Sequence, residues 1–323
     1  MSGALAHRDP DTPVLHGTLG AILHLEMLDA ADEDALDRAC ERLWAWIGPH
    51  LTFANLSCAD STETIRRTHL EYVPSYVTAL TAPAAPRPEE QLMHNRMTAH
   101  GRTDFFLLCS GADDPAKSSP HSIRFWAEMG IPPDQERDLP AYGVLHFTVP
   151  ETTPLDEFQR EVVAVAAELR LRWGAAGYTY SGLDLAPGRH AEEAQFAHAR
   201  RYPGYDLPAY VQVVTPFYRQ IRSVSWLTFL GPAMTGELRD LGQPLESQGE
   251  VQVFPTHDGG VLLRAGAAPD RGDVNRLWFP TAYREADAMV RPIRSEGRDV
   301  WFFHPWDETS TRDWLRRFER QVT

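Results

Sequence analysis

The side chains that most often do acid–base or metal chemistry are spread along this 323-residue chain without the spacing of a known catalytic motif. His190 and His198 stand eight residues apart with two glutamates between them. Two histidines that bind one metal ion from a helix are usually four apart. His94 and His100 have a similarly unsuitable spacing. A solvated helix face is therefore the preferred interpretation of these side chains, and we expect no metal site.

Other reactive side chains also have a simpler structural interpretation. His24 and His146 lie within apolar runs, where a histidine is usually a hydrogen-bonded core or edge residue rather than a base. Cys109 ends an apolar run, which favours a buried and inert thiol. Asp206 and Asp273 closely follow glycines and suit turn capping through backbone amides, although either could form half of an acid–base pair.

The best-marked enzyme motifs are absent. The chain contains no G-x-x-x-x-G-K-[S/T], G-x-G-x-x-G, G-x-S-x-G or H-E-x-x-H sequence. We therefore expect no catalytic residue and no cofactor.

The elements that must position these side chains follow from hydrophobic periodicity. Apolar runs and alternation predict strands at 20–28, 52–56, 105–109, 122–127, 143–149, 178–180, 210–214, 224–230, 251–254, 261–264 and 300–303. Helical periodicity predicts helices from about Asp32 to 47 and from Pro154 to about 174, with others at 191–200, after Pro232, at 279–290 and at 310–320, and partial helix at 64–80. The turn sequence His257-Asp258-Gly259-Gly260 predicts a hairpin between two of the strands.

Two segments of the chain are alike. A shift of 122 positions, the difference between positions 146 and 24, places His24 on His146, and it also places Leu36 on Phe158 and Leu43 on Val165. We expect an α+β protein with two related lobes, 1–135 and 136–323, each an antiparallel sheet packed with helices. Internal duplication is one interpretation. The other is that any strand followed by an amphipathic helix aligns this well.

Composition limits the class of protein and its compartment. The net charge is −14, the opposite of the basic balance expected for nucleic-acid binding, although charge alone also serves solubility. No apolar run approaches the roughly 18 residues of a membrane span, and the first residues lack the pattern of a signal peptide. The three cysteines form no C-x-x-C, and their odd number argues against a complete disulfide framework. We expect a cytoplasmic protein with neither a nucleic-acid nor a membrane partner.

Two acidic groups are candidates for contacting a basic partner protein. The first lies where the first predicted helix begins, and its carboxylates suit the positive end of a helix dipole: Asp29, Asp32, Glu33 and Asp34. The second joins an aromatic side chain to two carboxylates: Trp306, Asp307 and Glu308. Exposed, such a group resembles an interface hot spot. The default interpretation is core packing for the tryptophan and plain solvated charge for the carboxylates.

The chain from 178 to 294 carries an ordered set of turn and packing motifs. They are Tyr202-Pro203-Gly204, then Trp226-Leu227-Thr228-Phe229-Leu230-Gly231, then Arg264-Ala265-Gly266, Pro269 and Gly272-Asp273-Val274-Asn275. In this order they resemble the type VI secretion system immunity family, formerly known as a domain-of-unknown-function family. The resemblance implies a protein that neutralises a secreted toxin by binding it, with some members acting on VRR-Nuc nucleases. It implies no catalytic residue.

The motifs also give structural expectations. We expect Trp226 and Leu227 to be buried and Gly204 to adopt a positive φ in the Pro-Gly turn. The leading functional hypothesis is an antidote that occludes the active or substrate-binding surface of a toxin encoded by the adjacent gene. A hydrolase of an unmarked class that uses dispersed carboxylates stays open as an alternative. So does a structural or adaptor component of a secretion system.

Overall fold

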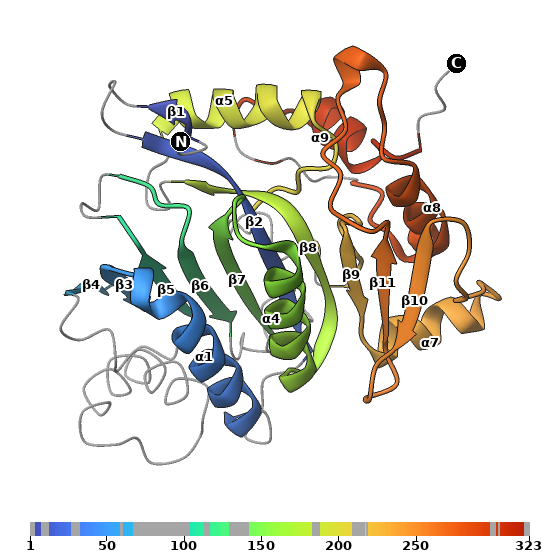
Figure 1. The fold of residues 1–323 in the computed structure, drawn as a ribbon, viewed down its shortest axis with the longest axis horizontal. Coiled ribbons are helices and arrows are strands. Elements are labelled where there is room, and N and C mark those ends of the chain that lie inside the picture. Colours follow the sequence, from blue (N-terminus) through green and yellow to red (C-terminus); the bar gives the residue numbers. More distant parts are fainter. Residues whose placement is uncertain are drawn as a thin grey trace, which may run out of the picture.

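The computed structural model describes residues 4–7, 13–26, 33–58, 61–66, 104–112, 117–128, 142–182, 188–208, 217, 219–297, 302 and 304–319. Its strands form one antiparallel sheet in the order β10-β11-β9-β8-β2-β7-β6-β5-β3-β4, with β1 paired to β2 beside this path (Figure 1). The strands are β1 (Ala4–His7), β2 (Pro13–Leu25), β3 (Phe53–Cys58), β4 (Ser61–Arg66), β5 (Asp104–Ser110), β6 (Ser122–Glu128), β7 (Tyr142–Pro150), β8 (Leu171–Gly182), β9 (Leu227–Leu230), β10 (Val251–Pro255) and β11 (Val261–Ala265).

The helices cover this sheet and its ends. They are α1 (Glu33–Ile47), α4 (Leu155–Glu168), α5 (Gly188–Arg201), α7 (Pro232–Asp240), α8 (Thr281–Val290) and α9 (Glu308–Leu315), with short 3₁₀ turns at Gly48–His50, Val274–Arg276 (η5) and Arg291–Ile293. α5 lies against β1 and β2, α7 against β8 and β9, and α8 against β10 and β11. Within the described ranges, no helix combines the length and the apolar character that crossing a membrane requires.

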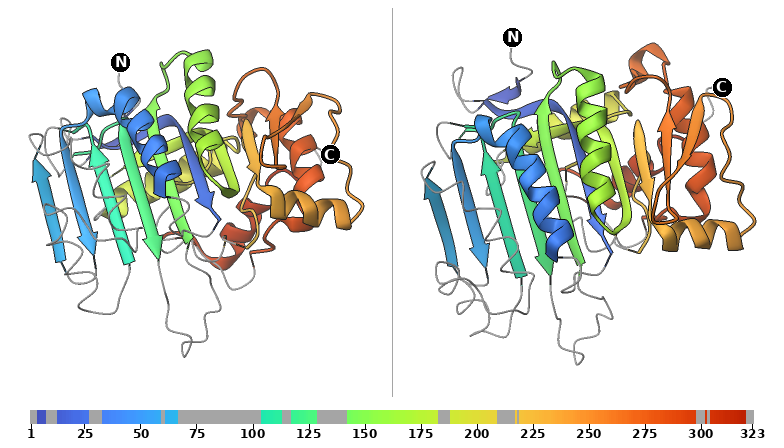
Figure 2. Two further views of the ribbon diagram at one scale, coloured as in Figure 1. Left: turned by 90° about the horizontal axis from the view of Figure 1, so that it is seen from below. Right: turned by 60° about the horizontal axis from the view of Figure 1, so that its bottom comes forward.

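α1 and α4 lie side by side on one face of the sheet (Figure 2). Each buries a stripe of apolar side chains at helical spacing: Leu36, Leu43 and Ile47 from α1, and Phe158, Val162 and Val165 from α4. The Arg38–Glu168 ion pair joins the two helices at an N···O distance of 2.7 Å. Pro154 precedes the first residue of α4, and its fixed φ suits a helix start.

The two expected sheets are in fact one, so this part of the prediction is wrong. β2 pairs with β7, Leu23 facing Leu145, and on its other side β2 pairs with β8. Residues 15–25 of β2 are buried on both faces, which requires a central place in a sheet. Strands from the two proposed lobes therefore interleave, and the proposed boundary at 135 lies outside the described residues. The shift of 122 positions does relate α1 to α4, and duplication stays a prediction.

Most of the expected elements are present, with differences in bounds: β1 was not expected, β2 begins at Pro13 rather than at 20, and β9 begins at Leu227 rather than at 224. Residues 64–66 belong to β4 rather than to a helix. α4 ends at Glu168 because Leu169 is already extended, and β8 begins at Leu171 rather than near 178. This part of β8 consists of small residues and lacks the alternation that predicts a strand. Glycine is needed at position 174 because a Cβ there would lie 2.7 Å from the Leu23 side chain. Of the strand expected at 300–303, the described Phe302 lies outside any strand. The strand expected at 210–214 lies outside the described residues.

Candidate functional site

The β10–β11 hairpin forms one end of the sheet, and its free edge is closed to further strand pairing. The outward N–H group of Val251 donates to the Gln248 carbonyl oxygen at 2.9 Å, and that of Val253 donates to Ser247 Oγ at 2.9 Å. The next outward position is Pro255, which has no N–H group. Edge strands protected in this way resist β-augmentation. A partner that binds here must therefore contact side chains.

An apolar groove of about 470 Å³ lies between this hairpin and α4. Its apolar lining includes Val163 of α4, Phe229 of β9 and Leu262 of β11. Phe254 of β10 also lines the groove and keeps 41% of its surface exposed. The Arg264 guanidinium lies 5.5 Å from the Phe254 ring centroid, which holds the aromatic ring beside a fixed positive charge. The groove thus combines an apolar floor with an exposed aromatic side chain.

The surface around this hairpin is acidic. Residues 237–258 contain five carboxylates against one arginine. All five carboxylates are exposed: Glu237, Asp240, Glu246, Glu250 and Asp258. Leu241, 59% exposed, lies among them in sequence, and a second groove of about 700 Å³ runs between β10 and residues 242–247. We call this region, residues 237–258 with its two grooves, the acidic edge. Its composition suits a basic protein partner with apolar side chains.

Sequence reasoning did not identify the acidic edge, although signals for it exist. The local excess of carboxylates can be counted, and Pro255 at the end of a predicted strand marks an edge position. The groove itself could not be found in this way. Its walls come from α4 and from a hairpin about 90 residues later, and only the fold brings them together.

The start of α1, which carries Glu33 and Asp34 of the first predicted acidic group, lies at the same end of the molecule as the hairpin turn (Figure 1). Asp29 and Asp32 fall outside the described residues. Glu33 is the first residue of α1, and Asp34 is exposed in the first turn. The Arg38–Glu168 ion pair ties this part of α1 to the end of α4, which lines the groove. Asp34 therefore stays a candidate contact beside the acidic edge.

The second predicted acidic group lies elsewhere, at the start of α9 (Figure 1). Trp306 is 5% exposed and packs edge-on against Phe302 and Trp314, so it fills the core rather than offering an exposed anchor. Asp307 caps α9 by accepting a hydrogen bond from the Ser310 N–H at 2.7 Å. Hydrogen bonds from Ser310 lower the pKa of Asp307. Glu308 pairs with Arg312 one turn later. The structure does not bring the two acidic groups together.

The turn motif packs against a later loop. The Tyr205 N–H donates to the Tyr202 carbonyl oxygen at 3.1 Å, which closes the turn. Gly204 does not have the positive φ that we expected. Glycine is needed at position 204 because a Cβ there would overlap the Asp270 carbonyl oxygen. Close approach of two backbones is what this glycine allows.

The tryptophan motif lies behind the same loop. Trp226 and Leu227 are 1% and 0% exposed, which confirms that both are buried. Trp226 Nε1 donates to the carbonyl oxygen of Gly266, whose φ is +84°, at 3.2 Å. At Gly231 a Cβ would overlap the Leu171 carbonyl oxygen, so glycine lets β8 and β9 approach. Trp226 and the Pro203-Gly204 turn thus converge around residues 266–273, whereas Gly231 serves the other end of β9.

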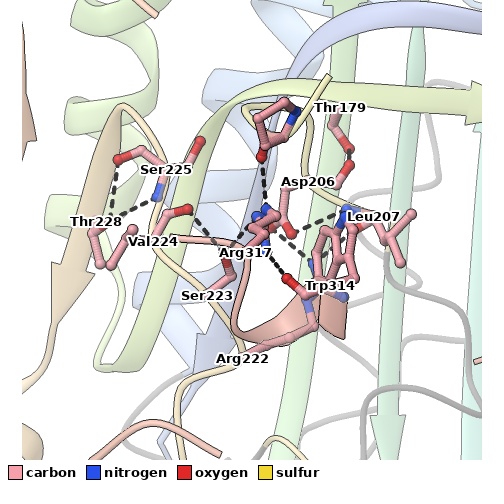
Figure 3. A network of polar contacts seen from close by, with 11 residues as sticks. Thr179, Asp206, Leu207, Arg222, Ser223, Val224, Ser225, Thr228, Trp314 and Arg317 are labelled. Atoms are coloured by element: carbon pink, nitrogen blue, oxygen red, sulfur yellow. Dashed lines mark hydrogen bonds and ion pairs between the residues drawn. The ribbon is translucent and has the colours of Figure 1, made fainter. Parts of the chain in front are cut away.

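A buried polar network connects the turn motif to α9 (Figure 3). Asp206 accepts a hydrogen bond from the Leu207 N–H at 3.0 Å and pairs with Arg222 at 2.8 Å. Arg317 donates to the Pro203 carbonyl oxygen at 2.6 Å and to Ser223 Oγ at 2.7 Å. Burial lowers the pKa of Arg317 to about 9. The network holds the turn in place, and the carboxylate, carbonyl and hydroxyl oxygens in it already accept hydrogen bonds from the protein itself.

The other candidate chemical groups have structural roles as well. Burial lowers the pKa of His24 and of His146 well below 6.5, and His24 stacks on Trp173 at 4.1 Å. Burial raises the pKa of the Cys109 thiol, which keeps it unreactive. Asp273 caps η5 through the Asn275 N–H. In the part of the chain that the structure describes, no three His, Cys, Asp or Glu side chains are placed to hold a metal ion.

Comparison with known proteins places these observations in a family. Residues 55–318 match the family model described as "Type VI immunity for VRR-NUC". The fold is similar to the solved structure of the Pseudomonas aeruginosa T6SS protein PA0821, with a TM-score of 0.72 and 19% sequence identity over 98% of this chain and 86% of that one. No protein with a curated description matches the chain. Because the family model spans most of the sequence, this chain belongs to the type VI immunity family for VRR-NUC.

Proposed function

We propose that this protein binds a VRR-Nuc toxin of a type VI secretion system and neutralises it by covering the surface with which the nuclease holds its substrate. The match to the immunity family over residues 55–318 carries this proposal. We also propose that the toxin is encoded by the adjacent gene and that the complex forms in the cytoplasm, where a nuclease would meet nucleic acid.

The charge of the molecule supports a contact with the phosphate-binding face. A nuclease must present basic side chains to the phosphate backbone of its substrate. This chain carries a net charge of −14, and its acidic edge offers carboxylates around exposed apolar side chains. Complementary charge speeds association and excludes the nucleic acid, which competes for the same basic surface.

The proposed mechanism is stoichiometric binding without turnover. Among the described side chains that were candidates for catalysis, Asp206 pairs with Arg222, Asp273 caps η5 and His24 packs in the core. A binding protein needs no cofactor and no activated nucleophile. The hydrolase alternative would require that a small amount of this chain inactivate a large amount of toxin.

A titration of nuclease activity tests the proposal. A fixed amount of the cognate VRR-Nuc domain is mixed with increasing amounts of this protein, and cleavage of DNA is measured at once and after hours. We expect inhibition to be complete near one-to-one and not to develop further with time. Inhibition that grows with time at a small fraction of the toxin concentration would show turnover, and no inhibition at any ratio would overturn the function.

Matched charge-reversal variants test the surface. The double variant Asp240→Lys with Glu246→Lys places two positive charges on the acidic edge. The control, Glu41→Lys with Asp156→Lys, makes the same change of net charge on α1 and in the first turn of α4, where both residues are exposed. We expect only the first to weaken binding, by about tenfold or more. Equal effects would show that the acidic edge is not the contact.

A further inference from the structure

Two adjacent apolar side chains project from the loop after η5. Leu277 is 71% exposed and Trp278 is 50% exposed. In the described part of the chain, only Leu241 and Phe254 are other large apolar side chains with comparable exposure. We call residues 274–278 the knob. It follows β11 in the chain and stands at the opposite end of that strand from the hairpin turn (Figure 1).

The backbone of the knob is unfavourable for the residue that it carries. Leu277 has φ 54° and ψ 28°, and it is the non-glycine residue with a positive φ among the described residues. A left-handed conformation is unfavourable for a residue with a Cβ, whereas glycine and asparagine adopt it more readily. A leucine that is both strained and exposed does not help the isolated chain to fold. Such outliers persist where a function requires them.

The knob is nevertheless held firmly. The Asp273 N–H donates to the Trp278 carbonyl oxygen at 2.8 Å, and the Trp278 N–H donates to the Asp273 carbonyl oxygen at 3.1 Å. Arg201 donates to both carboxylate oxygens of Asp273, at 3.2 and 3.1 Å. This pairing lowers the pKa of Asp273 below its ordinary value, so the carboxylate stays charged at neutral pH. The loop is therefore preorganised, which reduces the entropy lost on binding.

The motif residues form the base of the knob. The Gly204 N–H donates to the Arg271 carbonyl oxygen at 2.9 Å. Gly272 has φ +63°, and a Cβ there would lie 2.9 Å from Pro280 Cδ and 3.0 Å from Pro203 Cγ. The Pro203-Gly204 turn and the Gly272-Asp273 pair are thus pressed together directly beneath the exposed side chains. This packing positions the knob.

The charge around the knob is opposite to that of the acidic edge. Arg276 is 77% exposed and Arg201 is 44% exposed, as side chains. The guanidinium groups of Arg201 and Arg271 lie 4.9 and 5.4 Å from the ring centroid of Tyr202. Three arginines thus stand against two carboxylates, those of Asp270 and Asp273, and both carboxylates accept hydrogen bonds from the loop itself. Arginine and aromatic side chains are the types most enriched in binding hot spots, and this loop presents both.

We propose that the knob is a second docking element, in which Leu277 and Trp278 insert into an apolar recess of the toxin whose rim carries carboxylates. This inference rests on the proposed function. Guanidinium groups pair with carboxylates in a two-pronged geometry that fixes orientation. Nucleases that use metal ions hold those ions with carboxylates, so one nuclease surface offers both charge signs. The acidic edge meets the basic part of that surface, and the knob meets the acidic part.

Leu277→Gly separates binding from folding. Glycine tolerates the left-handed backbone, so we expect the melting temperature to stay the same or rise. The dissociation constant for the cognate VRR-Nuc domain should increase at least tenfold, because the inserted side chain is gone. Trp278→Ala should weaken binding about 30-fold, as expected for a hot spot. Leu277→Asn, which also tolerates this backbone, should behave like the glycine variant.

Charge reversal tests the rim. Arg276→Glu should weaken binding at least tenfold, whereas the control Arg160→Glu, at an arginine 62% exposed on α4, should leave binding unchanged. If the wild-type chain binds the nuclease and the knob variants bind it with the same affinity, this inference is overturned and the proposed function stands. Stronger binding by Arg276→Glu would show that the recess has no carboxylate rim, which also overturns it. Failure of the wild-type chain to bind or inhibit the nuclease would overturn the proposed function, and this inference with it.

Discussion

Trp226 and Trp278 differ in burial and therefore in what their removal should cost. Trp226 packs against Phe158, with ring centroids 6.4 Å apart, and is 1% exposed, whereas Trp278 is 50% exposed. Trp226→Ala should lower the free energy of unfolding by about 3–5 kcal/mol, mostly through the cavity that it leaves. Trp278→Ala should lower it by at most about 1.5 kcal/mol. Urea denaturation measures both, and equal losses would contradict the assignment of one to the core and the other to binding.

His198 should make the fold sensitive to mild acid. Burial, followed by the nearby Arg271 and Arg201, lowers its pKa to about 4, and its Nδ1 lies 3.0 Å from the Tyr180 hydroxyl oxygen. The unfolded chain has a histidine pKa near 6.5 and binds the proton more readily. Stability is therefore full above pH 6.5 and falls as the pH drops from 6.5 to 4.

The variant His198→Phe tests this linkage. It leaves the buried Tyr180 hydroxyl without its partner, which should cost about 1–3 kcal/mol at pH 7. The fall in melting temperature between pH 7 and pH 4.5 should nevertheless be smaller than in the wild-type chain. It should not vanish, because the pKa of His121 is also lowered to about 4. Identical pH profiles in the two proteins would show that His198 does not titrate as described.

At the scale of elements, two glycines around α7 should respond in opposite ways to the same substitution. Gly236 lies within α7, and a Cβ there would meet nothing within 4 Å. Gly236→Ala should raise the free energy of unfolding by about 0.5–1 kcal/mol, because alanine favours a helix and restricts the unfolded chain. Gly231→Ala places a Cβ against the Leu171 carbonyl and should lower it by about 1–3 kcal/mol. Denaturant titrations measure both changes in the free energy of unfolding, and changes of the same sign in the two variants would contradict this account.

Local elements were predictable where their pattern is local. The stripes of α1 and α4 and the turn of the β10–β11 hairpin can be recognised within a few residues of sequence. The beginning of β8 was missed because Gly174, Ala175, Ala176 and Gly177 carry no alternation, and its role depends on pairing with β2 more than 150 positions earlier. Which tryptophan is exposed was also not predictable, since Trp306 and Trp278 differ only in what the fold places around them.

At the scale of the whole molecule, two surfaces of opposite charge flank β11, because the acidic edge runs along β10 from Glu250 to the hairpin turn and the knob follows the other end of β11. The hairpin turn before β11 belongs to the acidic edge, and the loop after β11 carries the knob with its arginines. Both are anchored to the same end of the sheet, through β10 and through the motif residues beneath the knob. A single partner that presents both a basic and an acidic surface can therefore contact both.

Salt should act mainly on the rate at which this complex forms. Surface charges steer association and are screened beyond about 10 Å at 0.1 M salt, whereas packed apolar contacts are not. Raising NaCl from about 0.05 M to about 0.5 M should lower the association rate constant about tenfold or more and change the dissociation rate constant much less. The Asp240→Lys with Glu246→Lys variant should show a weaker salt dependence, and the Glu41→Lys with Asp156→Lys variant, of equal net charge, should keep the wild-type dependence. Stopped-flow association kinetics measure this, and equal changes in the two variants would mean that steering depends on the net charge of −14 and not on where the acidic edge lies.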